Sequence, residues 1–226
     1  MSEDTGAARI AELEADNRRL RRLLDQRDAP GELRHRLRNT LAMLRIVIRR
    51  SAETERDRDE FVAHLQDRLD AIARAQAAID SHGWIDLHTL LADELLYYGA
   101  SEGDRVTLSG PDIALLPKAG QVLAMAIHEL AVNAVEHGSL GAEAGRIDVA
   151  WHVANGDADP FLTLTWKESG LTSTTEPAHR GFGTEVLTRV LAYEFKAETA
   201  FAFEPDGLRC TITLLLPPQV GQVSDP

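Results

Sequence analysis

The sequence predicts an α+β protein in which an N-terminal coiled coil and a helical hairpin, paired with a second copy into a dimeric four-helix bundle, precede an α/β sandwich. Three observations predict it. Apolar residues keep helical spacing as far as residue 82, helix and strand patterns alternate after it, and 226 residues suffice for one large or two small domains. The expected parts are a coiled coil over 1–29, a hairpin over 30–82, a sandwich over 83–217 and a flexible tail over 218–226.

Composition is typical of a folded protein in a reducing compartment. Hydrophobic residues make up 44% and charged residues 27%, which allows a sizeable core. No run approaches about 18 consecutive apolar residues and no apolar leader is present, so we expect neither membrane insertion nor secretion. Cys210 is the only cysteine and lies in an apolar run. We therefore expect a cytoplasmic protein with Cys210 buried.

The charge distribution argues against nucleic acid as a partner. The net charge is −12, yet residues 1–50 hold 12 basic and 8 acidic residues and so carry +4. The remainder carries −16 and repels phosphate backbones. The basic segment is better suited to an acidic protein.

The first 29 residues have the pattern of a short coiled coil. The core positions recur at three- and four-residue steps, at Ile10, Leu13, Asn17, Leu20 and Leu24. An asparagine at an a-type position favours a parallel two-stranded register. A lone amphipathic helix is the alternative, because the pattern covers little more than two heptads. Pro30 and Gly31 then end the segment.

Two further apolar stripes predict the hairpin. The first comprises Leu33, Leu37, Leu41, Leu44 and Ile48, and the second comprises Phe61, Leu65, Leu69, Ile72, Gln76 and Ile79. A charged break over 53–59 separates them. Because a single hairpin has little core of its own, two copies are expected to pair into a four-helix bundle. A homodimer is thus predicted on two independent grounds.

His35 is expected to point away from the core of that bundle. At 3.6 residues per turn it lies about 200° from Leu33 and about 160° from Leu37. Neighbouring Arg34 and Arg36 favour the neutral imidazole and can receive a phosphate. A neutral, exposed ring nitrogen is a usable nucleophile, but most exposed helix histidines have no function. Only the other motifs of the sequence can indicate whether His35 has a function.

Residues 83–217 alternate between helix and strand patterns. Helices are expected over 87–98, 119–137 and 184–194, the first capped by Asp86 and ended by Gly99, the second ended by Gly138. Strands are expected over 105–109, 113–116, 146–154, 161–167, 197–204 and 208–216. This alternation predicts a sheet with helices on one face.

Polar residues on the helix over 119–137 are the first candidates for a binding site. Burial of its apolar stripe leaves Glu129, Asn133 and Glu136 or His137 along another face. Glu129 and Asn133 are neighbours one turn apart. A carboxylate can orient a nucleophile, and an amide oxygen suits Mg²⁺. Taken alone, the pattern also fits a solvated helix face.

Two segments that flank a polar loop complete the candidates. The loop over 169–180 ends in Gly181-Phe182-Gly183-Thr184 before a helix, where backbone amides can cradle phosphate. On its other side, Trp166-Lys167-Glu168-Ser169-Gly170 ends a strand. There Glu168 could accept a hydrogen bond from an adenine amino group while Gly170 admits the ring. Each motif alone is weak and also fits an ordinary turn.

In this order the motifs resemble those of the HWE family of bacterial sensor histidine kinases, over nearly everything from Glu32 to Pro217. His35-Arg36-Leu37-Arg38-Asn39-Thr40-Leu41 resembles the phosphoacceptor box, and His128-Glu129-Leu130-Ala131-Val132-Asn133-Ala134 resembles the N box. Trp166-Lys167-Glu168 resembles the diagnostic Trp-x-Glu motif, and Gly181-Phe182-Gly183-Thr184 resembles the G box. Four motifs in the right order outweigh the weakness of each.

The resemblance implies a dimeric histidine kinase that uses ATP and Mg²⁺ and has an ATP-binding domain of the Bergerat type. Such a kinase phosphorylates its own histidine and passes the phosphoryl group to an aspartate of a response regulator. By position, His35 is the acceptor, Asn133 holds Mg²⁺ and Glu129 supports the attack geometry. Glu168 accepts a hydrogen bond from adenine, and Gly181 and Gly183 let the loop before them close over the phosphates as a lid. The remaining nucleotide contacts expected are His137, Gly170 and Thr184.

Departures from the family pattern keep other functions open. Glu136-His137 replaces a lysine and an aromatic residue, Leu171 replaces a second glycine, and Lys196-Ala197 replaces a glycine pair. The preferred function is an active kinase without its own recognisable sensor domain, so that a separate sensor protein or the regulated coil provides the signal. The alternative is a non-enzymatic phosphotransfer protein or scaffold with a degenerate ATP domain. The complete phosphoacceptor box argues against a third function, an anti-sigma serine kinase.

Overall fold

A computed structural model describes residues 58–156, 159–172 and 182–223, together with the single positions 15, 16, 31, 41, 44, 45 and 48. The chain divides into two compact units, 1–70 and 71–226. This division falls within α3 (Arg58–His82), not after residue 82 as expected, because the last turns of that helix pack in the second unit. His35, the rest of its box and the core positions of the predicted coiled coil lie outside the described residues, except for Leu41.

In the first unit, the described positions agree in part with the predicted hairpin stripes. Leu44, Phe61 and Leu69 are only half-buried, and Arg68 is buried beside Leu69. Leu41 and Ile48 are buried while Arg45 is exposed, and Leu65 of α3 is buried. This alternation has the helical period on which the stripes were based. The coiled coil and the dimeric four-helix bundle stay predictions.

A five-stranded sheet forms one layer of the second unit. In spatial order its strands are β2 (Val106–Ser109), β4 (Arg146–Ala154), β5 (Phe161–Ser169), β7 (Gly207–Leu215) and β6 (Glu198–Glu204). β2 and β4 are parallel, and the other neighbours are antiparallel. Inward positions such as Ile147, Trp166 and Cys210 are buried, as period-two burial on one face requires. The expectation of a buried Cys210 is confirmed.

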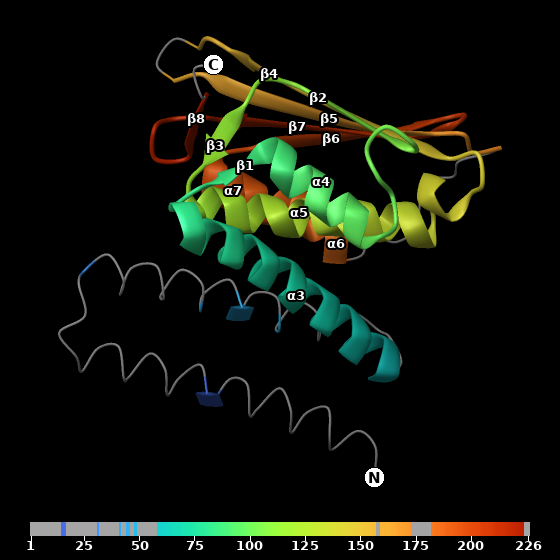
Figure 1. The fold of residues 1–226 in the computed structure, drawn as a ribbon, viewed down its shortest axis with the longest axis horizontal. Helices are drawn as coiled ribbons and strands as arrows, with labels where there is room; N and C mark the ends of the chain where they lie inside the picture. The colour runs from blue at the N-terminus through green and yellow to red at the C-terminus, as the bar shows by residue number, and fades with distance from the viewer. Residues whose placement is uncertain are drawn as a thin grey trace. The chain divides into compact units, whose positions relative to one another are not determined.

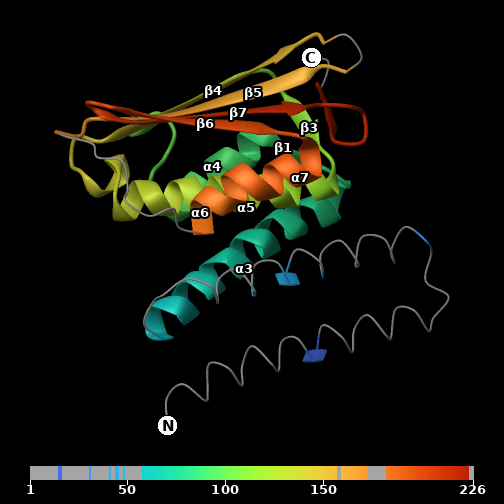
Figure 2. The same ribbon diagram turned by 180° about the vertical axis from the view of Figure 1, so that it is seen from behind.

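The second layer consists of helices on one face of this sheet (Figures 1 and 2). They are α4 (Leu87–Tyr97), α5 (Pro117–Glu136), α6 (Phe182–Glu185) and α7 (Leu191–Phe195). The Asp86 side chain caps α4 by accepting a hydrogen bond from the backbone N–H of Thr89 at 2.9 Å. The predicted α/β sandwich is therefore confirmed.

A small second sheet was not predicted. β1 (Ile85–Asp86), β3 (Ile113–Leu115) and β8 (Gly221–Val223) pair antiparallel in the order β1-β3-β8. The prediction of a flexible tail over 218–226 is wrong for 221–223, which pair with β3. Of its three strands only β3 was expected, as a strand over 113–116. β1 and β8 have two and three residues, too few to show an alternating pattern, so the sequence alone did not reveal them.

The helix expected over 184–194 is interrupted. Between α6 and α7 lies a π-helical segment, η2 (Val186–Val190), and the Thr188 hydroxyl donates to the Thr184 carbonyl at 2.7 Å. Such a bond from a side chain to the preceding turn competes with regular helix hydrogen bonding. Lys196 then ends α7 in the left-handed region, with φ 52°.

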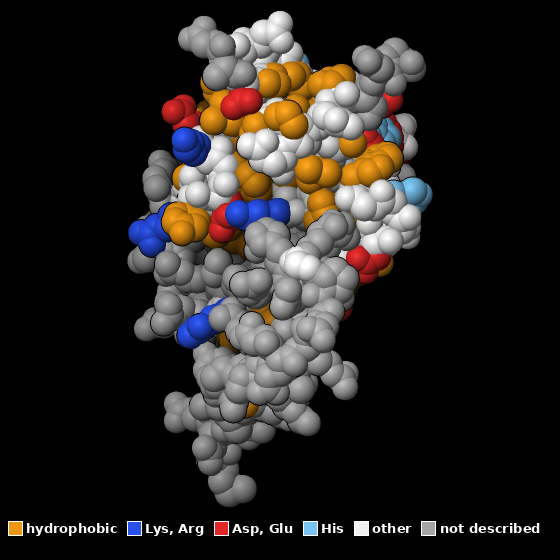
Figure 3. Space-filling model, turned by 90° about the vertical axis from the view of Figure 1, so that its left-hand side faces the viewer, with side chains coloured by type: hydrophobic (Ala, Val, Ile, Leu, Met, Phe, Trp, Pro, Cys, Tyr) orange, Lys and Arg blue, Asp and Glu red, His pale blue; other side chains and the backbone are white. Residues whose placement is uncertain are grey.

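The face drawn in Figure 3 carries many apolar side chains among few charged ones. Exposed large apolar side chains of the unit include Trp84, which directly precedes β1, and Val223, the last residue of β8. Apolar atoms form much of any protein surface, so this face alone does not identify a binding site. Within the described ranges, no helix combines the length and the hydropathy that a bilayer span requires.

Candidate nucleotide site

α5 places two of the predicted site residues one turn apart. Its apolar stripe faces the core, as expected, with Leu123, Ile127 and Leu130 buried. Glu129 is also buried, at 3% exposure, whereas Asn133 is half-buried. The Glu129 side chain thus does not lie on a solvated face. This argues against the alternative that Glu129 and Asn133 are merely part of a solvated helix face.

Gly183 of α6 lies directly against that pair. A Cβ added to Gly183 would lie 2.9 Å from Oε2 of Glu129 and 3.2 Å from Nδ2 of Asn133. Both separations are shorter than ordinary van der Waals contact, so any larger residue at this position would require the side chains of Glu129 and Asn133 to shift. Three predicted site residues from distant parts of the chain are thereby brought together.

Glu168, at the end of β5, is turned into the protein. Its Oε2 accepts a hydrogen bond from the backbone N–H of Ser139 at 2.8 Å, and its Oε1 accepts from Nε1 of Trp166 at 3.2 Å. Burial raises the pKa of the Glu168 carboxyl in spite of these bonds, which act in the opposite direction. A carboxylate has about four lone-pair sites, so two remain for another donor. Trp166 and Glu168 also have a structural role, since they join β5 to the turn after α5.

The other predicted contacts are less closely grouped. Gly170 adopts φ +86° just after β5, a conformation that favours glycine. His137 is exposed, and its Nε2 lies 3.6 Å from Oε2 of Glu136. Thr184 is half-buried next to Gly183. Gly181 and the loop over 173–181 lie outside the described residues.

The residues around Gly183 fit a nucleotide with Mg²⁺. The amide oxygen of Asn133 and the carboxylate of Glu129 are hard oxygen donors, and Mg²⁺ commonly combines one or two such groups with phosphates and water. In the described part of the chain, no group of three or more His, Cys, Asp and Glu side chains could hold a metal ion. A magnesium ion here would depend on phosphate oxygens, which suits a nucleotide site.

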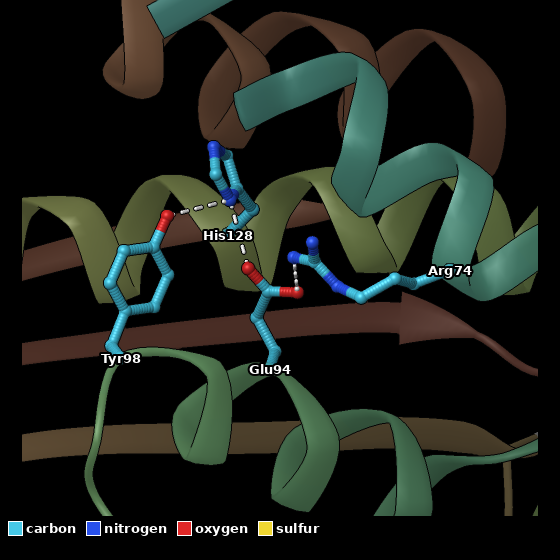
Figure 4. A network of polar contacts seen from close by, with 4 residues as sticks. All are labelled: Arg74, Glu94, Tyr98 and His128. Atoms are coloured by element: carbon cyan, nitrogen blue, oxygen red, sulfur yellow. Dashed lines mark hydrogen bonds and ion pairs between the residues drawn. The ribbon is translucent and has the colours of Figure 1, made fainter. Parts of the chain in front are cut away.

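A buried polar network adjoins this site through His128, the residue before Glu129 (Figure 4). Nδ1 of His128 lies 2.8 Å from Oε1 of Glu94 and 3.2 Å from the Tyr98 hydroxyl. Nη2 of Arg74, in α3, donates to Oε2 of Glu94 at 2.7 Å, and its guanidinium carbon lies 4.1 Å from the centroid of the Tyr97 ring. The network therefore links α3, α4 and α5.

Arg74 and Glu94 were not among the predicted residues. One signal was available, because Glu94 stands in α4 among the buried residues Leu91 and Leu95. An ionised carboxylate on a buried helix face needs a partner, and this predicts that one exists. It does not identify the partner, since Arg74 and His128 come from other helices.

Comparisons with known proteins find related sequences. Residues 32–112 match the family model described as HWE histidine kinase. The chain is 34% identical over 197 residues to Blue-light-activated histidine kinase 1 of Erythrobacter litoralis, covering 84% of this chain and 53% of that protein. It is 28% identical over 191 residues to Blue-light-activated histidine kinase of Brucella ovis, covering 84% and 39%. The chain thus spans about half or less of these curated relatives.

Solved structures show a similar fold. The histidine kinase domain of a blue-light-activated histidine kinase from Erythrobacter litoralis aligns with a TM-score of 0.56 at 16% identity, covering 94% of this chain and 96% of that one. A second structure of a blue-light-activated histidine kinase from the same organism aligns with a TM-score of 0.52 at 18% identity, covering 84% and 63%. At such identities the likeness concerns the fold alone.

Proposed function

The chain belongs to the HWE histidine kinase family, and from this premise we propose that it phosphorylates His35 with ATP and passes the phosphoryl group to an aspartate of a response regulator. The observation that carries the proposal is the contact of Gly183 with Glu129 and Asn133. It joins the N box and the G box, which the sequence places far apart, in one site.

In the proposed reaction a ring nitrogen of His35 attacks the γ-phosphorus of ATP. The N–P bond forms, the bond from the γ-phosphorus to the β–γ bridging oxygen breaks, and ADP leaves. Such transfer depends mainly on positioning and charge neutralisation. Mg²⁺, when bound, would supply charge neutralisation at the phosphates, with Asn133 as its protein ligand.

Other residues would position the reactants. Glu129 would orient the attack on the phosphate, and Glu168 would accept a hydrogen bond from the adenine amino group with a lone pair that Ser139 and Trp166 leave unused. Gly183 would let α6 approach the phosphates. We further propose that two hairpins form the dimer, which then presents His35 to the nucleotide and to the regulator.

One observation favours the non-enzymatic alternative. Both carboxylate oxygens of Glu168 already accept hydrogen bonds within the chain, so adenine would have to share them. In a phosphotransfer protein or scaffold with a degenerate ATP domain, that arrangement would be purely structural. Calorimetric titration with ATP and magnesium separates the two functions, because the alternative requires no nucleotide affinity.

The decisive experiment incubates the purified chain with γ-labelled ATP and magnesium. We expect an acid-labile, base-stable label that His35→Ala abolishes, as a phosphorylated histidine requires. The control is His152→Ala, which replaces an exposed histidine on β4 and should leave labelling unchanged. Acid-stable label, or label that persists in His35→Ala, would contradict the proposal.

A further inference from the structure

α3 passes from one compact unit into the other without a break. It runs from Arg58 to His82, and the units divide between residues 70 and 71. A helix of 25 residues is about 37 Å long and is held by hydrogen bonds along its whole length. A shift or rotation of its first half is therefore transmitted to its second half.

The second half of α3 is attached to α4 and α5 by apolar and polar contacts. Ile79 packs against Gly120, where an added Cβ would lie 3.2 Å from Cδ1 of the isoleucine. Gln121 of α5 donates a hydrogen bond to Gln76. Arg74 binds Glu94 of α4, as described above. These contacts fix α3 to the start of α5, and the contact of Glu94 with His128 extends the attachment further along α5.

The chemistry of the network defines where its proton lies. Burial raises the pKa of Glu94, but hydrogen bonds and charge from His128 and Arg74 outweigh burial and hold the pKa below its ordinary value. Glu94 is consequently ionised at neutral pH and can only accept hydrogen bonds. Nδ1 of His128 must then carry a hydrogen atom and donate a hydrogen bond to Glu94. Each oxygen of Glu94 thus has its own donor, one from α5 and one from α3.

Such a network has few ways to relax. His128 is 1% exposed and Glu94 is 4% exposed. Loss of Arg74 would therefore leave a buried carboxylate without the charged hydrogen-bond donor to one of its two oxygens. His128 directly precedes Glu129 and lies five residues before Asn133. A rotation of α5 at His128 would displace both side chains, and displacements of about 1 Å can reduce a rate about a hundredfold.

We propose that Arg74, Glu94 and His128 are positioning residues for phosphoryl transfer. They hold α5 in the orientation that places Glu129 and Asn133 correctly, and they do so only while the second half of α3 is packed against α4 and α5. The inference rests on the proposed kinase function and deepens it. It assigns to α3 a task beyond dimerisation, since its last turns would set the geometry of the nucleotide site.

The test compares Arg74→Met with Arg74→Lys in the full chain. Methionine keeps most of the apolar stem and removes the donor, whereas lysine restores a charged donor to Glu94. Arg209→Met is the matched control, because Arg209 donates from Nε to Glu204 at the same 2.7 Å on the strand β7. The side chains of Arg74 and Arg209 are 32% and 38% exposed, so neither change should prevent folding.

We expect Arg74→Met to lower the labelling rate at saturating ATP about tenfold, with a smaller rise of about two- to threefold in the dissociation constant for ATP, because Asn133 is displaced and not removed. Arg74→Lys should recover most of the rate, and Arg209→Met should alter neither quantity. An unchanged rate in Arg74→Met would overturn the inference. So would equal losses of rate and affinity, or equal effects in Arg209→Met, because these indicate general destabilisation.

Hydrogen exchange keeps the inference testable without kinase activity. In Arg74→Met, amides of α5 around His128 to Asn133 should exchange faster than in the unaltered chain, whereas Arg209→Met should not change them. If the unaltered chain does not label itself, the proposed function fails, and this exchange measurement still decides on the network. Equal exchange in all three proteins would overturn the coupling of α3 to α5.

Discussion

The carboxylate of Glu168 accepts a hydrogen bond from the backbone N–H of Ser139, three residues after the last residue of α5. This contact joins the central strand of the five-stranded sheet to the C-terminal end of the helix that carries Asn133. The two ends of the candidate site are therefore held together by a buried acid.

That acid makes the stability of the unit depend on pH. Because burial raises its folded pKa, the ionised form of Glu168 is disfavoured in the folded protein. The contribution of Glu168 to the free energy of unfolding is fully present below the ordinary pKa of glutamate, about 4.3, and is lost as the pH rises through the pKa of the folded protein. We expect the free energy of unfolding, relative to Glu168→Gln, to fall as the pH rises above about 4.3 in urea titrations.

Glu204→Gln is the control, for which we expect a pH dependence of stability with the opposite sign. The hydrogen bond from Arg209 lowers the pKa of Glu204, so its contribution is present above the ordinary pKa and is lost as the pH falls through the folded pKa. Glu204 is half-buried at the surface, where solvent screens the ion pair, and we expect this effect to be small. A difference between wild type and Glu168→Gln that does not vary with pH would contradict the assignment of Glu168.

Gly183→Ala tests the close approach of α6 to α5. The new methyl group would press on Glu129 and Asn133, and overpacking of this kind costs about 1–3 kcal/mol. We expect α6 to retreat and the affinity for ATP with magnesium to fall about tenfold, measured by calorimetry. The control is Gly31→Ala, where an added Cβ meets nothing within 4 Å. Unchanged affinity in Gly183→Ala would exclude Gly183 from the site.

Asn133→Ala tests the proposal that Asn133 is a magnesium ligand. Loss of the amide oxygen should weaken binding of ATP about tenfold or more with magnesium present and have little effect in its absence. Asn155→Ala, at an exposed position after β4, should bind as the unaltered chain does. An equal loss with and without magnesium would assign Asn133 to contact with the nucleotide itself.

The predicted assembly can be tested by light scattering. We expect a dimer whose dissociation constant rises when residues 1–28 are deleted, because the coiled coil and the hairpin are predicted on separate grounds to pair. Substitution of Asn17 by leucine is informative in addition, since it should relax the preference for two strands. A monomer at all concentrations would contradict both predictions.

Elements with a long regular pattern were predictable from the sequence. β4 has the expected bounds because alternation persists over nine residues, and α4 begins after Asp86 because its side chain caps the helix. Glu129 and Asn133 could be grouped by their spacing of one helical turn, whereas Gly183 was added from its motif, because no local rule relates it to residues so far away in the chain.

Other features depend on contacts that one segment cannot reveal. β8 exists because β3 offers it an edge, and η2 forms where Thr188 bonds back to Thr184. The partnership of Glu94 with Arg74 and His128 arises only after three helices have packed. For the same reason, the inward turn of Glu168 differs from the open adenine contact that its motif suggested.

The parallel pairing of β2 with β4 has a consequence for biosynthesis. Among the described strands, β2 pairs with β4 alone, and the ribosome must make β3 and all of α5 before β4 emerges. A nascent chain in which β2 and α5 have left the ribosomal exit tunnel, while β4 is still inside it, exposes an unpaired edge and the apolar side of α5, both of which invite association with other chains. Codons that slow translation at this stage should therefore lower the yield of native protein.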